Sequence, residues 1–314
     1  MPNLTNFPNG VSSFGLPVYG TPVNGAPLTG QVMFVDTVNG VNAGTGNGPN
    51  NPYQTIAYAL TQVTSGAYAT IYVLPGSSTT ISSATALTLN VANVDIVGLG
   101  TGAQRPVFAY TTANTAAIPV SAANVTVRNF RHTGGFLSIA RAYTVTAAGF
   151  TLDGNLFTDN SGVLNFLNII NCTGAANTAD RLTVTNNTWN GLGTTSVNSF
   201  LLTANDIDSL TFSGNTVNLA ATTDAASGVT VTAGVLTKAS IAYNRTYRAN
   251  TATSNGALVN LSGTTSTGLI NNNYCLTLDA SAPLLFTATT GLGAFENYVS
   301  GAITLSGLLT PANA

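Results

Sequence analysis

The residues of this chain that are suited to catalysis or metal binding are few and scattered. Its 314 residues include eight Lys and Arg, ten Asp and Glu, one His and two Cys. The best acid pair is Asp206 and Asp208 in ANDIDSL, because residues i and i+2 of a strand share one face about 6.5 Å apart. Two carboxylates at that separation are compatible with glycoside hydrolysis. Asp is also a common turn residue, and we favour a structural role for this pair.

The remaining candidates have simpler interpretations. Arg128 and Asp153 occupy equivalent positions in adjacent copies of the repeat described below, where a surface salt bridge explains them. His132 in FRHTG has no acidic residue at a matching spacing, so we predict a surface histidine rather than a general base. Cys172 and Cys275 are too few for a metal site or a disulfide framework, and we predict buried free thiols. The sequence therefore predicts no catalytic residues, no metal, no cofactor and no enzymatic activity.

The composition favours short strands joined by tight turns. The chain is 44% hydrophobic but only 6% charged, against roughly 25% charged in an average soluble domain. Its net charge of −2 comes from scattered residues, without a basic patch for nucleic acid. No apolar run approaches the ~18 residues of a membrane span. The N-terminus MPNLTNFPNG lacks the features of a secretory signal, so we expect synthesis in a cytoplasm.

A hexamer of the form apolar-x-apolar-x-[Gly/Asn]-Asn recurs at a mean spacing of about 28 residues. Its copies are VDIVGL (94–99), VTVRNF (125–130), FTLDGN (150–155), LTVTNN (182–187), LTFSGN (210–215), ASIAYN (239–244), GLINNN (268–273) and GAFENY (293–298). Further short strand patterns lie between the copies, with no helix-length pattern. A period of this length suffices for three short strands and their turns. The repeat predicts an all-β chain, a single-stranded right-handed parallel β-helix of roughly eight to nine coils.

The sixth position of the hexamer is Asn in five successive copies. Each of these residues stands where the chain turns after a strand, and turns one coil apart lie about 4.8 Å from each other. Their side-chain amides are therefore expected to hydrogen-bond along the solenoid axis as a structural asparagine ladder. The predicted ladder consists of Asn155, Asn187, Asn215, Asn244 and Asn273.

The segment NNPYQTIAYALTQV (50–63) predicts a short helix that covers the N-terminal end of the solenoid. Asn51 is a candidate N-cap and Pro52 a candidate first helical residue, and Ile56 and Leu60 follow at helical spacing. We divide the chain into an arm (1–30), an N-terminal cap with the helix and the first coil (31–80), the β-helix (81–300) and a C-terminal tail (301–314).

The first thirty residues read as an extended arm. Glycine recurs at every fifth position from Gly10 to Gly30, and three tandem copies of G-x-P-aliphatic-x stand between the later glycines. Proline and glycine at this density block a helix and a packed strand, so we expect a polyproline-II-like arm without a core of its own. Its apolar residues suggest docking to a partner. These residues are Phe7, Phe14, Leu16, Val18, Tyr19, Val23 and Leu28.

The order VMFVDTVNGVNAGTG, PYQTIAYAL, TIYVLPG and then Asn-containing coils resembles the right-handed parallel β-helix proteins of the pectin-lyase-like superfamily. Within it, the chain looks most like the short versions found as virion proteins of tailed bacteriophages. That superfamily includes lyases, hydrolases, depolymerases and non-enzymatic virion components. The calcium-binding aspartates and R-x-P-x-x-R of pectate lyases, and the motifs of polygalacturonases, are absent here.

The resemblance suggests a non-enzymatic structural protein of a phage virion, a capsid decoration or cement protein on the capsid surface. The arm would dock to the major capsid protein or another virion protein, and analogy suggests a homotrimer. Neither nucleic acid nor a membrane is expected as a partner. Two alternatives stay open: a tailspike-like polysaccharide depolymerase and a glycan-binding adhesion module.

Overall fold

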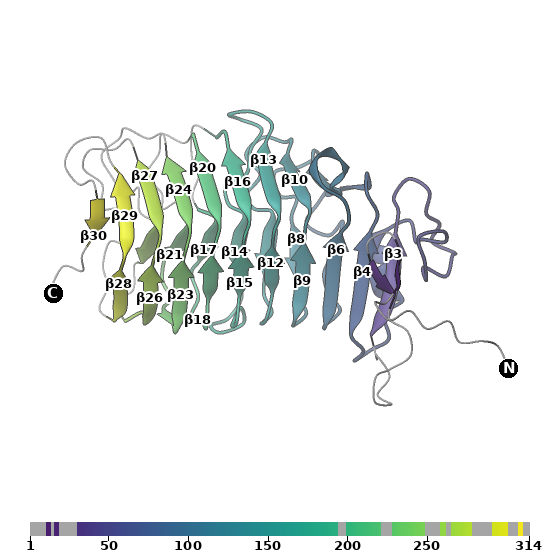
Figure 1. Cartoon of the computed structure of the whole chain (residues 1–314), viewed down its shortest axis with the longest axis horizontal. Coiled ribbons are helices and arrows are strands. Elements are labelled where there is room, and N and C mark those ends of the chain that lie inside the picture. Colours follow the sequence, from purple (N-terminus) through teal and green to yellow (C-terminus); the bar gives the residue numbers. More distant parts are fainter. Residues whose placement is uncertain are drawn as a thin grey trace.

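The computed structural model describes residues 11–13, 16–18, 30–193, 199–220, 228–248, 258–261, 265–277, 291–300 and 307–309. The chain is a parallel β-solenoid whose strands stack along the longest axis of the molecule (Figure 1). Successive strands along the chain belong to different sheets, and each strand pairs in parallel with its equivalents in the turns before and after. Neighbouring strands in space are therefore about one turn apart in the sequence.

Three sheets form the sides of the solenoid. The first has ten strands: β3 (Gln31–Val35), β4 (Ala69–Val73), β6 (Val94–Gly98), β9 (Val125–Arg128), β12 (Thr151–Asp153), β15 (Thr183–Thr185), β19 (Thr211–Ser213), β23 (Ala239–Ala242), β26 (Gly268–Asn271) and β28 (Leu292–Phe295). The second contains β5 (Ser78–Thr80), β7 (Val107–Tyr110), β10 (Arg131–Gly134), β13 (Leu156–Asp159), β16 (Thr188–Gly191), β20 (Thr216–Leu219), β24 (Arg245–Arg248), β27 (Tyr274–Thr277), β29 (Asn297–Ser300) and the antiparallel β30 (Gly307–Leu309). The third contains β8 (Ile118–Val120), β11 (Tyr143–Val145), β14 (Ile170–Cys172), β17 (Leu201–Thr203), β21 (Val229–Val231) and β25 (Val259–Leu261). A two-stranded ladder of β18 (Ile207–Asp208) and β22 (Leu236–Thr237) lies beside them.

The number of complete turns is lower than the sequence predicted. Six turns of the described chain contribute a strand to all three sheets, whereas eight to nine coils were expected. The discrepancy arises because the hexamer marks strands of the first sheet only. Among the described residues, the last two hexamers, on β26 and β28, have no third-sheet strand in their turns, so counting hexamers overcounts complete turns.

The predicted N-terminal helix starts later and is shorter than expected. Helix α1 (Ile56–Thr61) has six residues, and its N-cap is Thr55, whose hydroxyl accepts the backbone N–H of Tyr58. Asn51 and Pro52 precede it in irregular structure. Tyr53 instead lies along the edge of β3, because its N–H donates to the Phe34 carbonyl and its carbonyl accepts the Asp36 N–H. An extended segment, not a capping helix, thus satisfies this edge of the first sheet.

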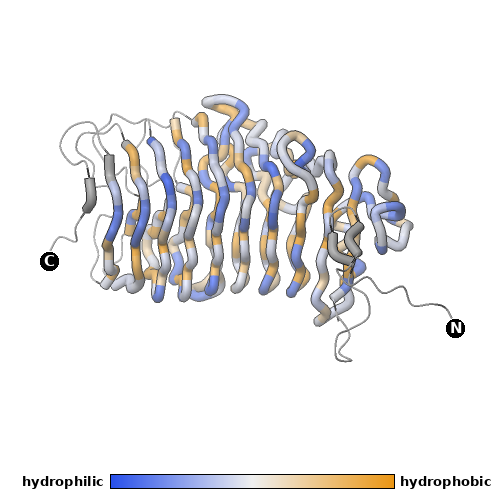
Figure 2. Tube along the Cα trace, viewed as in Figure 1, coloured by the Kyte–Doolittle hydropathy of each residue, from blue (hydrophilic) through white to orange (hydrophobic). Residues whose placement is uncertain are grey.

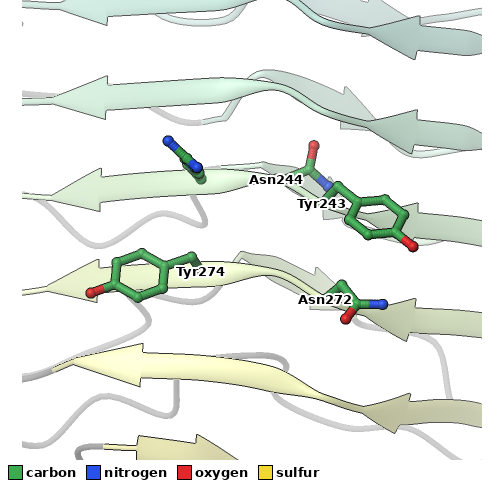
Figure 3. Close-up of a pocket in the computed structure, with 5 residues that line it drawn as sticks. Tyr243, Asn244, Asn272 and Tyr274 are labelled. Atoms are coloured by element: carbon green, nitrogen blue, oxygen red, sulfur yellow. The ribbon is translucent and has the colours of Figure 1, made fainter.

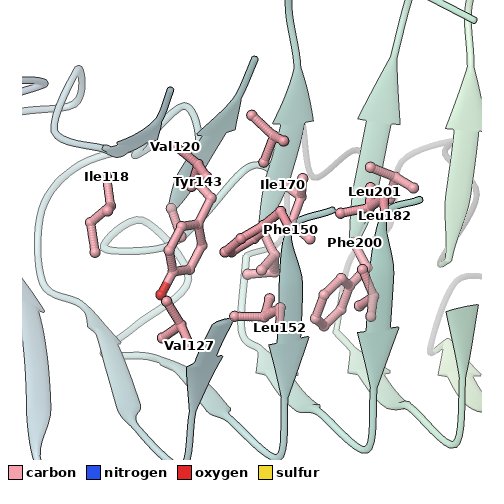
Figure 4. Packing of buried hydrophobic residues seen from close by; sticks show 14 of the residues in the cluster. Ile118, Val120, Val127, Tyr143, Phe150, Leu152, Ile170, Leu182, Phe200 and Leu201 are labelled. Atoms are coloured by element: carbon pink, nitrogen blue, oxygen red, sulfur yellow. The ribbon is translucent and has the colours of Figure 1, made fainter. Parts of the chain in front are cut away.

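The interior is filled by side chains that alternate along each strand. Figure 2 shows the alternation of apolar and polar residues along the turns, and Figure 4 shows Tyr143, Phe150, Leu152 and Phe200 packed between the sheets. Burial of each such side chain contributes roughly 1.5–3 kcal/mol, so stability is distributed over all turns. Cys172 and Cys275 are buried and free, as predicted. Burial raises the pKa of Cys172 to about 12 and that of Cys275 to about 11.

The N-terminal arm contains one element that differs from the expectation. Strands β1 (Val11–Ser13) and β2 (Leu16–Val18) pair in antiparallel fashion, whereas a polyproline-II segment has no internal hydrogen bonds. Of the residues proposed for docking, Leu16 and Val18 belong to β2. The others, Phe7, Phe14, Tyr19, Val23 and Leu28, lie outside the described residues.

Candidate functional site

The five asparagines of the sixth hexamer position stack on one another inside the solenoid. All are buried. The Asn187 side-chain oxygen accepts both the backbone N–H and the Nδ2 of Asn155, at 2.9 and 3.2 Å, and its own Nδ2 donates to the Leu152 carbonyl at 2.8 Å. The same contacts recur at Asn215, Asn244 and Asn273. These amides replace backbone partners at a turn that would otherwise leave buried polar groups unsatisfied.

The ladder has a sixth member that the sequence pattern missed. Asn297 accepts from both the backbone and the side chain of Asn273, at 3.1 and 2.9 Å. Strand pairing places Leu292 beside Gly268, so the last hexamer is LGAFEN (292–297) and not GAFENY (293–298). A shift of the last copy by one residue would have placed Asn297 in the sixth position.

The fifth hexamer position adopts the left-handed conformation in seven successive turns. Its φ values lie between 52° and 67° at Asn129, Gly154, Asn186, Gly214, Tyr243, Asn272 and Glu296. Gly and Asn tolerate this conformation best, and other residues adopt it at a cost in free energy. Tyr243 and Glu296 are therefore the two departures from the local rule.

The acidic pair weighed for catalysis connects neighbouring turns. The Asp206 carboxylate accepts the backbone N–H of Val235 at 2.8 Å. The backbone N–H of Asp208 donates to Asp180 at 2.8 Å, and its carboxylate accepts a hydrogen bond from Lys238, which lowers its pKa. The predicted ion pair of Arg128 and Asp153 is confirmed at 2.9 Å.

His132 is not a surface residue, and that prediction was wrong. Its ring is fully buried and stacks on Phe157, with ring centroids 4.2 Å apart. Burial lowers its pKa to about 3, so the imidazole is neutral near pH 7. The ring lies in register with Phe108 and Phe157, two residues after the sixth hexamer position, where later turns place Phe157 and Trp189 inward. The apolar residues at this position in the neighbouring turns were the signal that could have predicted a buried His132.

Asp159 is a buried carboxylate that the sequence did not single out. It accepts the backbone N–H groups of Phe166 and Leu192, at 3.0 and 2.9 Å, and so joins segments of two successive turns. Burial raises its pKa to about 6, although the hydrogen bonds counteract part of this shift. Its position makes it a structural acceptor.

An exposed aromatic surface lies directly outside the C-terminal half of the ladder. It consists of Tyr243, Arg245, Tyr274, Phe295, Glu296 and Tyr298, and we call it the tyrosine edge. The exposed fractions of its tyrosines are 64% for Tyr243, 50% for Tyr274 and 48% for Tyr298. Arg245, Tyr274 and Tyr298 directly follow ladder residues and pair side by side on β24, β27 and β29. In the earlier turns this position holds Leu156, Thr188 and Thr216.

Part of the tyrosine edge borders a hollow between two turns. The hollow has a volume of about 440 Å³ and is lined by Tyr243, Asn244, Arg245, Asn272 and Tyr274. Figure 3 shows Tyr243 near the turn that follows the first sheet and Tyr274 on the strand that follows the turn. The hexamer pattern did not indicate this surface, because Arg245 and Tyr274 lie outside the hexamer and Tyr243 and Glu296 depart from the residue types preferred at its fifth position.

Within the described part of the chain, no group of three or more His, Cys, Asp or Glu residues is placed to hold a metal ion. None of the described helices is long and apolar enough to span a membrane.

Comparisons with known proteins give structural similarity at low identity. No family model and no curated protein matches the chain. A solved rhamnogalacturonan lyase matches with a TM-score of 0.48 and 11% identity, over 85% of this chain and 87% of the lyase. A GH136 lacto-N-biosidase from Eubacterium ramulus matches with a TM-score of 0.42 and 10% identity, over 86% of this chain and 68% of that protein. ORF18 of Geobacillus virus E2 matches with a TM-score of 0.32 and 13% identity, over 78% of this chain and 57% of that protein. The assignment as a β-solenoid rests on the strand register itself.

Proposed function

We propose that this chain is a non-enzymatic structural protein of a phage virion, a capsid decoration or cement protein that docks through its N-terminal arm. The main support for the proposal is that the polar side chains of the chain serve as structural contacts. The groups that could have done chemistry, including Asp206, Asp208, Asp159 and His132, are engaged in contacts between turns or packed in the core. Such an arrangement favours a rigid element over a reactive surface.

The dimensions of the solenoid suit a spacer. The ten strands of the first sheet, at about 4.8 Å per spacing, make a stack about 43 Å long. The ladder and the continuous core connect each turn to the next, so the stack is expected to bend little. A protein of this kind can hold its two ends at a fixed separation on a particle surface.

The arm provides the attachment in this proposal. It precedes Gln31, the first residue of β3, and is therefore joined to the N-terminal end of the solenoid. Residues 1–30 contain no charged residue and several large apolar ones, a composition suited to burial against another protein. Docking of the arm to the major capsid protein or another virion protein would direct the C-terminal turns away from the capsid.

The test is the location of the protein on purified particles of the phage that encodes it. We expect many copies over the capsid surface by immunogold labelling or electron cryomicroscopy. A protein lacking residues 1–30 should retain its β-sheet circular dichroism and its thermal transition but fail to bind particles stripped of the native protein. Absence from particles, a few copies at the tail tip, or binding without the arm would refute the proposal.

A further inference from the structure

The tyrosine edge departs from the residue preference of the fifth hexamer position at two turns. Five of the seven left-handed residues at the fifth hexamer position are Gly or Asn, and the exceptions are Tyr243 and Glu296. Both side chains are exposed, so core packing does not compensate for the unfavourable conformation. Residues that conflict with local preference without a gain inside the fold point to a function at that surface.

The same surface carries two opposite charges without ion-pair partners among the described residues. The described part of the chain contains two ion pairs, Arg128 with Asp153 and Lys238 with Asp208, and neither involves this surface. Arg245 and Glu296 are both exposed. Arg245 pairs in register with Tyr274, and Tyr274 with Tyr298, next to Glu296. The two charges therefore lie on either side of Tyr274, about two strand spacings or ~10 Å apart along the axis.

This arrangement is complementary to itself. A two-fold axis close to Tyr274 exchanges the two ends of the edge, so each Arg245 would meet the Glu296 of the other copy. In an isologous interface residue i contacts j and j contacts i, which is the pattern that one cation and one anion on either side of a centre provide. A partner with charge of a single sign would leave one of the two groups opposite a like charge. The low net charge of −2 opposes association of two copies only weakly.

We propose that the tyrosine edge binds the tyrosine edge of a second copy of this chain in an antiparallel two-fold pair. The exposed ring of Tyr274 lies at its centre, Tyr298 lies beside Glu296 at one end, and the Arg245 to Glu296 contacts fix its register. Tyrosine combines a large apolar ring with a hydroxyl that tolerates water, which suits a surface that is exposed before assembly. The inference deepens the proposed structural role, since pairing at the C-terminal turns would connect neighbouring copies away from the arm.

Sedimentation velocity and light scattering of the purified full-length chain test the pairing without any particle. We expect a dimer in equilibrium with monomer as the concentration rises. Tyr274→Ser should weaken association at least ~10-fold. The matched control is Tyr68→Ser, which removes a tyrosine that is 65% exposed but lies just before β4, many turns away. This control should associate like the parent chain.

Charge reversal tests the register. Arg245→Glu and Glu296→Arg should each weaken self-association at least ~10-fold, and an equimolar mixture of the two variants should associate again to within ~3-fold of the parent. A dimer restored by mixing supports the proposal. A chain that is monomeric at all concentrations, the homotrimer that analogy with phage virion proteins suggests, or a mixture that stays monomeric would overturn it.

Two further outcomes separate this inference from its alternatives. A monomer retained on polygalacturonate-agarose, and released by Tyr274→Ser, would overturn it in favour of a sugar ligand. Deleting residues 1–30 should leave dimerisation unchanged while abolishing attachment to particles. Failure of the virion role and failure of the pairing therefore produce different results.

Discussion

Replacing His132 by phenylalanine is expected to reduce the sensitivity of the solenoid to acid. The imidazole is buried between Phe108 and Phe157 and has a pKa of about 3, against 6.5 for an unperturbed histidine. Between pH 6.5 and 3 the His132 imidazole binds a proton in the unfolded chain but stays neutral in the folded chain. The stability contributed by neutral His132 is therefore present above pH 6.5 and is lost as the pH falls toward 3.

The magnitude follows from the distance to the unfolded pKa. A pH of about 4.5 lies two units below the unfolded pKa of 6.5. Because each unit corresponds to about 1.36 kcal/mol, the free energy of unfolding of the parent chain should fall by about 3 kcal/mol through this residue between about pH 8 and about pH 4.5. The phenylalanine variant should lose none of it. At about pH 8 its free energy of unfolding should lie within ~1.5 kcal/mol of the parent's, because a similar ring fills the same place.

Denaturant titrations across this pH range, followed by the fluorescence of the buried Trp189, measure the difference. Subtracting the two curves removes contributions that parent and variant share, including that of Asp159. Tyr110→Phe is the matched control: it removes a buried hydroxyl that donates to the Ala142 carbonyl, but it introduces no change in titration in this range. Equal acid destabilisation of the His132→Phe variant and the parent would refute the assignment.

Three further predictions concern the same framework. Asn187→Ala should lower the free energy of unfolding by ~2–4 kcal/mol, because it leaves two Asn155 donors and the Leu152 carbonyl without their partner; chemical denaturation measures this, and a loss below ~1 kcal/mol would contradict the structural role of the ladder. Asp159 has a folded pKa of about 6, above its unfolded 3.8, so its contribution to stability is greatest below pH 3.8 and is lost as the pH rises through 6. In denaturant titrations, Asp159→Asn should remove this pH dependence, which amounts to ~2–3 kcal/mol in the free energy of unfolding between pH 3.8 and 6. A variant with the same pH profile as the parent would contradict the assignment. Tyr243→Asn should raise the free energy of unfolding of the monomer by ~0.5–1 kcal/mol, because asparagine tolerates φ 58° better than tyrosine; a lower melting temperature would show that the tyrosine side chain stabilises the turn.

The sequence predicted the parts of the fold that repeat with a fixed spacing. The hexamer located the strands of the first sheet and the turn after them, because one inward pattern and one left-handed position recur in each turn. It failed in the last copy, where Glu296 adopts the left-handed conformation of the fifth position although it is neither Gly nor Asn. At position 298 a tyrosine was aligned with the ladder, although Asn297 occupies that place.

The candidate site was less predictable for a physical reason. Inward residues are constrained by packing and turn residues by backbone conformation, so both leave periodic patterns. Outward residues have no such constraint, and a change from Thr216 to Arg245 and Tyr274 along one sheet carries meaning only once the register of the strands is known. His132 shows the converse, because its polar side chain led to the prediction of a surface position, whereas its register with Phe108 and Phe157 places it in the core.

The asparagine ladder also bears on how such a chain can change its length. Every internal rung donates to the next and accepts from the previous one through the same atoms. Removing one whole period, such as residues 188–215, would bring Asn187 next to Asn244 and leave no amide without a partner. Duplication of a period would be accommodated in the same way. The ladder therefore allows gain or loss of single turns, and a lineage of such proteins can adjust the reach of the rod in steps of about 4.8 Å.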